Sequence, residues 1–219
     1  MSKTWFTETI EKVNPLMDEI KNHPFVKELS QGTLSEERFH FYMYQDSYYL
    51  NGYGKVLADI SNRLKNPDHS LDYLNFASGT IEVEKALHKD FIEKIQGFEP
   101  PEKSPTCALY TGFLTEVHQR ESTEVSLAAV LPCFWIYKEI GDYVLSIADT
   151  TNNPYQNWMD TYGGEDFAQS VNRAIEITED YAGKATAATR EGMTRAFLKT
   201  SQMEWMFWDA AYRLEKWPV

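Results

Sequence analysis

A proline and a cysteine that follow one another inside a helical pattern are the first residues that suggest chemistry. Pro132 and Cys133 lie in the apolar stretch 131–137. A proline inside a helix removes a hydrogen bond and clashes with the carbonyl four residues earlier, at a cost of ~3 kcal/mol. A kink kept beside a thiol indicates that Cys133 is directed at a ligand, with Tyr137 one turn later on the same face. The alternative is a small buried hydrophobe, as most free cysteines are.

Two carboxylates lie among aromatic residues. Glu204 lies in stretch 203–208, which is rich in Met, Trp and Phe, and Asp46 lies on a helix face with tyrosines at spacings of four, three and seven: Tyr42, Tyr49 and Tyr53. A buried carboxyl has a raised pKa, which suits acid–base chemistry near neutral pH. The alternative for each acid is a structural hydrogen bond to a buried hydroxyl. Catalysis would require both carboxylates to meet Cys133 in the fold.

A metal site, a phosphate site and a serine nucleophile are all disfavoured by the pattern. Glu84 and His88 are four residues apart, a spacing that can hold iron or zinc, but no histidine follows His118 to complete a set. A structural Glu84–His88 hydrogen bond is the preferred interpretation, and no cofactor is expected. The chain has neither a glycine-rich phosphate loop followed by lysine nor a Gly-x-Ser-x-Gly motif.

Composition limits the class of protein and its surroundings. A net charge of -12 argues against binding to nucleic acid or to an anionic membrane surface. No apolar run is long enough for a membrane span and no signal peptide is evident, so a cytoplasmic location is expected. Two cysteines, Cys107 and Cys133, do not make a disulfide framework. Aromatic residues make up 14% of the chain, and surplus tyrosine can line a pocket for a flat ligand.

Apolar spacing predicts helices almost throughout, with no alternating strand pattern and no fixed repeat. The expected helices are 5–21, 25–29, 35–64, 71–95, 106–121, 123–148, 155–162, 166–181 and 186–214. Residues 66–68 are interpreted as a turn. Long helices joined by short loops predict a compact all-α bundle, and the lack of a linker predicts a single domain over residues 1–219.

The chain resembles the thiaminase II, or TenA, family over nearly its whole length. The resemblance rests on an ordered series of segments: residues 23–25, 31–34, 39, 44–50, 84–88, 131–141, 153–155, 158, 162 and 201–208. It implies a haem-oxygenase-like fold that binds no haem and assembles as a homotetramer. The implied activity is hydrolysis of an aminomethylpyrimidine to ammonia and hydroxymethylpyrimidine for thiamin salvage, and cleavage of thiamin into its pyrimidine and thiazole halves.

Site residues follow from the same resemblance, position by position. Cys133 matches the nucleophile and places the chain in the cysteine-containing branch, Glu204 matches the acid–base, and Asp46 matches the pyrimidine-binding carboxylate. The pocket aromatics correspond to Tyr49, Tyr110, Tyr137 and Tyr162. A binding or regulatory protein that holds a pyrimidine without converting it remains an alternative, as does, less favourably, a metal-dependent oxidase. The preference among aminopyrimidine, formylaminopyrimidine and thiamin stays open.

Overall fold

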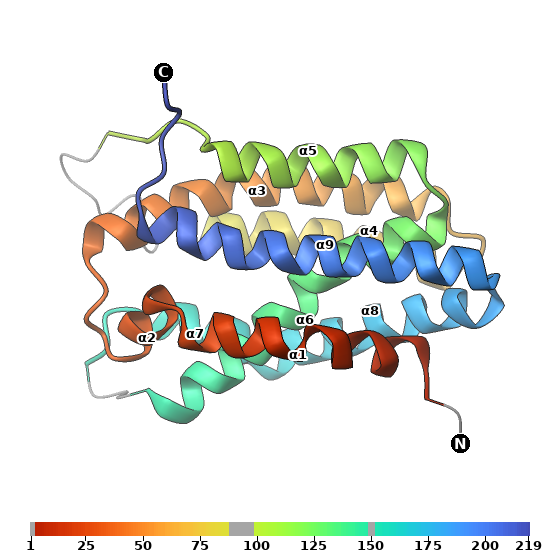
Figure 1. Cartoon of the computed structure of the whole chain (residues 1–219), viewed down its shortest axis with the longest axis horizontal. Coiled ribbons are helices and arrows are strands. Elements are labelled where there is room, and N and C mark those ends of the chain that lie inside the picture. The colour runs from red at the N-terminus through yellow and green to blue at the C-terminus, as the bar shows by residue number, and fades with distance from the viewer. Residues whose placement is uncertain (1–2, 88–98, 149–151) are drawn as a thin grey trace.

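Helices make up all the regular structure that the computed structural model describes, which covers residues 3–87, 99–148 and 152–219 without the side chains of Glu84, Ala86 and Leu87 (Figure 1). In chain order they are α1 (Trp5–Asn22), α2 (Pro24–Ser30), α3 (Glu36–Ser61), α4 (Pro67–Leu87), α5 (Pro105–Arg120), α6 (Thr123–Ile147), α7 (Gln156–Gly163), α8 (Glu165–Lys184) and α9 (Ala187–Tyr212). The predicted all-α class is confirmed. None of these helices is long and apolar enough to cross a membrane.

Proline marks the start of several helices. The predicted turn at residues 66–68 is wrong, because α4 already begins at Pro67 rather than at residue 71. Proline suits the first helical position, where no N–H partner is needed, and Asn66 Oδ1 accepts a hydrogen bond from the Asp68 N–H at 2.9 Å. The predicted end of this helix at residue 95, and His88, lie outside the described residues.

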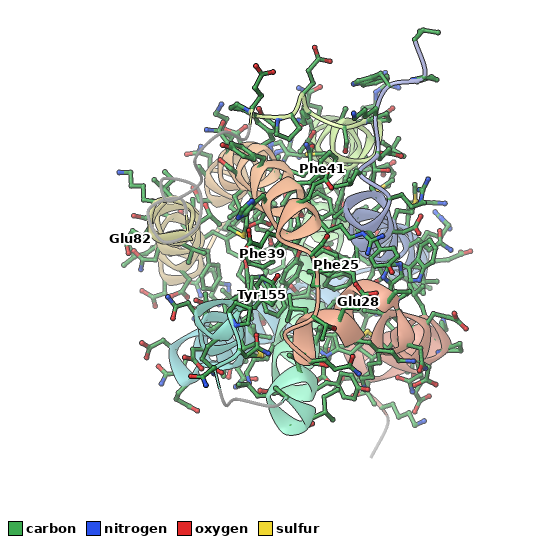
Figure 2. The ribbon with its side chains drawn as sticks, turned by 90° about the vertical axis from the view of Figure 1, so that its left-hand side faces the viewer. Phe25, Glu28, Phe39, Phe41, Glu82 and Tyr155 are labelled. Carbon is green, nitrogen blue, oxygen red and sulfur yellow. The ribbon has the colours of Figure 1, made fainter. Side chains whose placement is uncertain are left out.

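The arrangement of the helices is layered around α9. Figure 1 shows α9 along the middle of the molecule, with α5 and α3 on one side and α1 on the other. Helix α6 packs extensively against α9 and also contacts α7 and α8, whereas α3 packs chiefly against α4. The interior between α3 and the segment before α7 is filled by Phe39 and Tyr155, whose ring centroids lie 4.4 Å apart (Figure 2).

Helix α6 carries the proline–cysteine pair through the centre of the protein. It continues without a break past Pro132, and most of its residues are buried. Because proline has no N–H, the carbonyl of Ala128 loses its usual helical donor. In the same turn, Tyr53 Oη of α3 donates to the carbonyl of Val130 at 2.8 Å. This bond ties the turn that carries Cys133 to the neighbouring helix.

A glycine allows α7 to approach α6 closely. A Cβ added at Gly141 would lie 2.6 Å from the carbonyl carbon of Tyr162, a separation that real side chains essentially never show. The close approach brings Tyr162 of α7 against Tyr137 of α6, with ring centroids 4.8 Å apart. Glycine at position 141 therefore sets the distance between two of the expected pocket aromatics.

Substitution Gly141→Ala tests this packing. The added methyl group would force α7 away from α6, so we expect the free energy of unfolding to fall by ~1–3 kcal/mol, the usual cost of overpacking. Thermal denaturation followed by circular dichroism measures the change. The matched control is Gly112→Ala in α5, where a Cβ meets nothing within 4 Å, and where alanine should stabilise the helix by ~0.5–1 kcal/mol. Equal melting temperatures for the two variants would contradict the packing argument.

Candidate active site

A pocket of about 680 Å³ lies among α3, α4, α6, α7 and α8. Mostly buried residues of α3, α6 and α7 form one wall, among them Asp46, Tyr137, Tyr162 and the partly buried Cys133. The opposite wall consists of partly or fully exposed residues of α4 and α8, such as Phe76, Glu82, Phe167 and Arg173. Figure 2 shows Glu82 on the outer side of α4. The lining residues are more exposed on the α4 and α8 side than on the opposite side. The pocket therefore opens to solvent between α4 and α8.

The two cysteines lie in different environments. Cys107 is fully buried, its Sγ donates to the carbonyl of Gln45 at 3.4 Å, and burial raises its pKa to about 12. Cys133 is only partly buried and lines the pocket. Cys133 is therefore the thiol that a ligand in this pocket would meet, whereas Cys107 is a core residue.

Glu204 of α9 is a buried carboxyl, 1% exposed. Burial is the largest effect on its pKa and raises it from 4.5 to about 8, which the negative charge of Asp46 supports. Tyr110 Oη donates to Glu204 Oε1 at 2.6 Å, and this hydrogen bond acts in the opposite direction. At neutral pH the carboxyl therefore keeps its proton and can act as an acid.

The Cys133 thiol lies within electrostatic reach of both carboxylates. Burial first, then the charges of Glu204 and Asp46, raise the pKa of Cys133 well above its ordinary value of 9.0. The hydroxyls of Tyr49 and Tyr53 act in the opposite direction on this pKa. The resting thiol is thus protonated, and a thiolate must form by a local proton transfer.

Aromatic rings surround these three groups on two sides. Tyr49 stacks on Tyr53 with centroids 5.4 Å apart and lies 4.7 Å from the ring of Tyr110. Tyr137 and Tyr162 form the second group, with Tyr162 4.8 Å from Trp158. Tyr49 Oη is buried and has no hydrogen-bond partner among the described residues. That hydroxyl is available to the thiolate of Cys133, whose pKa it lowers.

The predicted site residues fall into two groups, those that line the pocket and those that do not. Asp46, Cys133, Tyr137 and Tyr162 line the pocket itself. Glu204, Tyr49 and Tyr110 are not among its lining residues and lie behind that wall, linked to Cys133 through the effects on pKa described above. Neither His88 nor the side chain of Glu84 belongs to the described residues. Within the described part of the chain, no group of three or more His, Cys, Asp or Glu residues could hold a metal ion.

Sequence reasoning missed the α4–α8 wall of the pocket. Arg173 Nε donates to Asp72 Oδ2 at 2.8 Å, and Arg173 also pairs with Glu176 at 3.0 Å. Asp72 and Arg173 line the pocket, so this ion pair joins α4 to α8 at the pocket wall. The two residues are 101 positions apart in the sequence, and nothing in the pattern around either one indicated that they would meet.

Comparison with known proteins places the chain in a family. A model described as the TENA/THI-4/PQQC family matches residues 10–214. The chain belongs to this family. It is 37% identical over 199 residues to an aminopyrimidine aminohydrolase of Bacillus subtilis strain 168, which covers 89% of this chain and 84% of that protein. The family predicted from the sequence motifs is confirmed.

Solved structures of the TENA/THI-4/PQQC family and of its fold agree with this membership. A TenA homologue protein from P. horikoshii OT3 has a TM-score of 0.82 at 26% identity, covering 96% of this chain and 99% of that one. A domain with a heme oxygenase-like fold from Shewanella denitrificans OS217 has a TM-score of 0.76 at 15% identity, covering 95% and 92%, and shares the fold alone. The predicted haem-oxygenase-like fold is confirmed.

The raised pKa of Glu204 predicts a pH-dependent stability. The pKa of Glu204 in the folded protein, about 8, lies above the ordinary value of 4.5. The contribution of this carboxyl to the free energy of unfolding is therefore highest below pH 4.5, where the carboxyl is neutral in both states, and it falls as the pH rises through 8. Glutamine is neutral at every pH. Glu204→Gln should therefore raise the melting temperature by a few degrees at pH 8–9 and leave it nearly unchanged at pH 4.

Differential scanning calorimetry from pH 4 to pH 9 measures this difference. The control is Glu19→Gln on α1, which makes the same chemical change at an exposed side chain and so measures the general effect of replacing a glutamate by glutamine. If Glu204→Gln and the wild type have the same melting temperature at every pH, the Glu204 carboxyl is not held protonated in the folded protein.

Proposed function

We propose that this chain is an aminopyrimidine aminohydrolase, or thiaminase II, which converts 4-amino-5-aminomethyl-2-methylpyrimidine and water to the hydroxymethylpyrimidine and ammonia. The supporting observation is that Cys133 and Asp46 line one aromatic pocket and that the buried Glu204 carboxyl acts electrostatically on Cys133, in a chain of the TENA/THI-4/PQQC family. The identity of 37% to the Bacillus subtilis aminopyrimidine aminohydrolase supports the same reaction. Thiamin would be split into its pyrimidine and thiazole halves at the same site.

The first half of the proposed reaction is addition of sulfur to the ring. Glu204, protonated at neutral pH because burial raises its pKa to about 8, donates its proton to a ring nitrogen and makes the ring electrophilic. The Cys133 sulfur then bonds to a ring carbon, and the thiol proton passes to the vacated Glu204 carboxylate. This local transfer supplies a thiolate that the raised pKa of Cys133 otherwise withholds.

The second half replaces the amine by water. Electrons return from the sulfur adduct towards the exocyclic carbon, the bond to the amine breaks, and ammonia leaves with a proton from Glu204. Water adds to the resulting methylene, and Glu204 takes a proton from it. The bond between Cys133 and the ring carbon then breaks, and the proton that the ring nitrogen received in the first half passes to the departing sulfur. Atoms and charge balance with water as the one co-substrate.

Asp46 and the tyrosines bind the heterocycle. The Asp46 carboxylate, 2% exposed at the pocket wall, would accept from the exocyclic amine of the pyrimidine. Tyr137 and Tyr162 offer ring faces to a flat ligand, and such stacking contributes ~1–3 kcal/mol per base in nucleic-acid complexes. The remaining volume between α4 and α8 gives room for a leaving group larger than ammonia, which supports thiamin as a second substrate.

Substitution of the nucleophile tests the reaction. Cys133→Ser keeps the size of the side chain but replaces the thiol with a much weaker nucleophile, so ammonia release should fall by ~1,000-fold or more. Binding of hydroxymethylpyrimidine, measured by calorimetry, should stay within about threefold of the wild type. The control Cys107→Ser removes the core thiol and should keep near-normal turnover. Wild-type protein that binds the pyrimidine without releasing ammonia would instead indicate a binding or regulatory protein.

The proposal also covers the oligomeric state of the protein and its location in the cell. We infer a cytoplasmic homotetramer built from single-domain chains of residues 1–219. Helix α4 supports the oligomer because it exposes apolar side chains along one stripe: Leu71 at 57%, Leu74 at 48% and Ile81 at 49%. Exposed apolar residues that share one helix face are typical of protein interfaces. The net charge of -12 gives no support to a nucleic-acid or membrane partner.

Charges placed on this stripe should disrupt the assembly. Leu74→Glu/Ile81→Glu places two carboxylates in the proposed interface, and we expect light scattering after size exclusion to show a smaller particle than the wild type. The control Leu109→Glu alters an equally exposed leucine of α5, 50% exposed, and should leave the particle unchanged. A tetramer that survives the double substitution would place the interface elsewhere.

A further inference from the structure

Three buried side chains behind the pocket form a chain of hydrogen bonds. Trp158 Nε1 donates to Tyr42 Oη at 3.2 Å, and Tyr42 Oη donates to Tyr137 Oη at 3.2 Å. Their exposed fractions are 1% for Trp158, 0% for Tyr42 and 4% for Tyr137. Tyr137 lines the pocket, whereas Tyr42 and Trp158 do not. The chain therefore begins in the core and ends at the ligand cavity.

The indole fixes the direction of the first of these bonds. An indole N–H can donate but cannot accept, so Tyr42 Oη must accept at its junction with Trp158. Tyr42 has one proton to donate, and the geometry directs it to Tyr137. Tyr137 Oη accepts that bond and still holds its own proton. The bond from Tyr42 reaches Tyr137 Oη from the core side and Tyr137 lines the pocket, which directs the Tyr137 proton to the cavity side.

We infer that Tyr42 is a positioning residue, which together with Trp158 makes Tyr137 a hydrogen-bond donor towards the ligand. This inference rests on the proposed function and adds a specific contact to it. A donor at the pocket wall fits a ring nitrogen of the pyrimidine, which is an acceptor, while Asp46 fits the exocyclic amine, which is a donor. The two contacts together recognise both kinds of polar group on the edge of one heterocycle.

A double-mutant cycle tests the inference. Tyr42→Phe keeps the ring and removes the hydroxyl, so Tyr137 is free to rotate its proton away from the ligand. Binding of hydroxymethylpyrimidine, measured by calorimetry, should weaken by ~3- to 10-fold, the usual effect of one hydrogen bond. Tyr137→Phe should weaken binding at least as much. Because Tyr42 acts through Tyr137, the double variant Tyr42→Phe/Tyr137→Phe should bind no more weakly than Tyr137→Phe alone.

Kinetics and a matched control separate positioning from general loss of stability. Tyr42→Phe should raise KM for ammonia release and change kcat by less than about twofold. The control Tyr155→Phe removes another buried tyrosine hydroxyl, which donates to the carbonyl of Leu34 outside the pocket. That variant should lose stability in the same way and keep normal affinity.

If Tyr42→Phe does not fold, Trp158→Phe takes its place in the cycle. It removes the donor that occupies one acceptor position of Tyr42 Oη. It should weaken binding more when residue 137 is tyrosine than when it is phenylalanine. Equal losses in both backgrounds, or wild-type affinity in Tyr42→Phe, would overturn the inference while leaving the proposed function standing. Wild-type protein that does not bind the pyrimidine would refute the proposed function, and this inference with it.

Discussion

Burial of the Glu204 carboxyl within electrostatic reach of the Cys133 thiol is the constraint on which the site depends. Removal from water raises the pKa of both groups, so each keeps its proton when the pocket is at rest. Neither is therefore a strong base or nucleophile on its own. The proposed reaction uses them as a pair, in which the proton that leaves one group is taken up by the other or by the ligand. Asp46 adds a negative charge that reinforces this state.

The helices supply this environment by bringing distant segments into one place. Asp46 comes from α3, Cys133 from α6 and Glu204 from α9, and α9 lies along the middle of the molecule (Figure 1). The Tyr53 bond to the Val130 carbonyl joins α3 to the turn of α6 that carries the thiol. Glycine at position 141 allows α7 to close the aromatic wall. Local packing thus places groups that the chain separates widely.

The pocket has two walls with different physical roles. The wall of α3, α6 and α7 is aromatic and buried, which lowers the local dielectric and strengthens each electrostatic interaction in it. The wall of α4 and α8 is polar and more exposed, and the Asp72–Arg173 ion pair crosses it. Such an arrangement suits chemistry at the buried wall and exchange of substrate and product at the other.

The helical class and most helix ranges followed from the sequence, because apolar periodicity is a local property. The family, and Tyr137 and Tyr162 as pocket residues, came from the resemblance of sequence motifs to the TenA family. The sequence also singled out Cys133, Asp46 and Glu204 by their aromatic neighbours. It did not determine that α4 begins at Pro67, since proline serves both turns and first helical positions. Only the tertiary structure decided which thiol faces the pocket, which acid is held protonated, and how Trp158 and Tyr42 direct Tyr137. Burial, pKa and hydrogen-bond direction depend on neighbours far away in the chain, and folding alone brings those neighbours together.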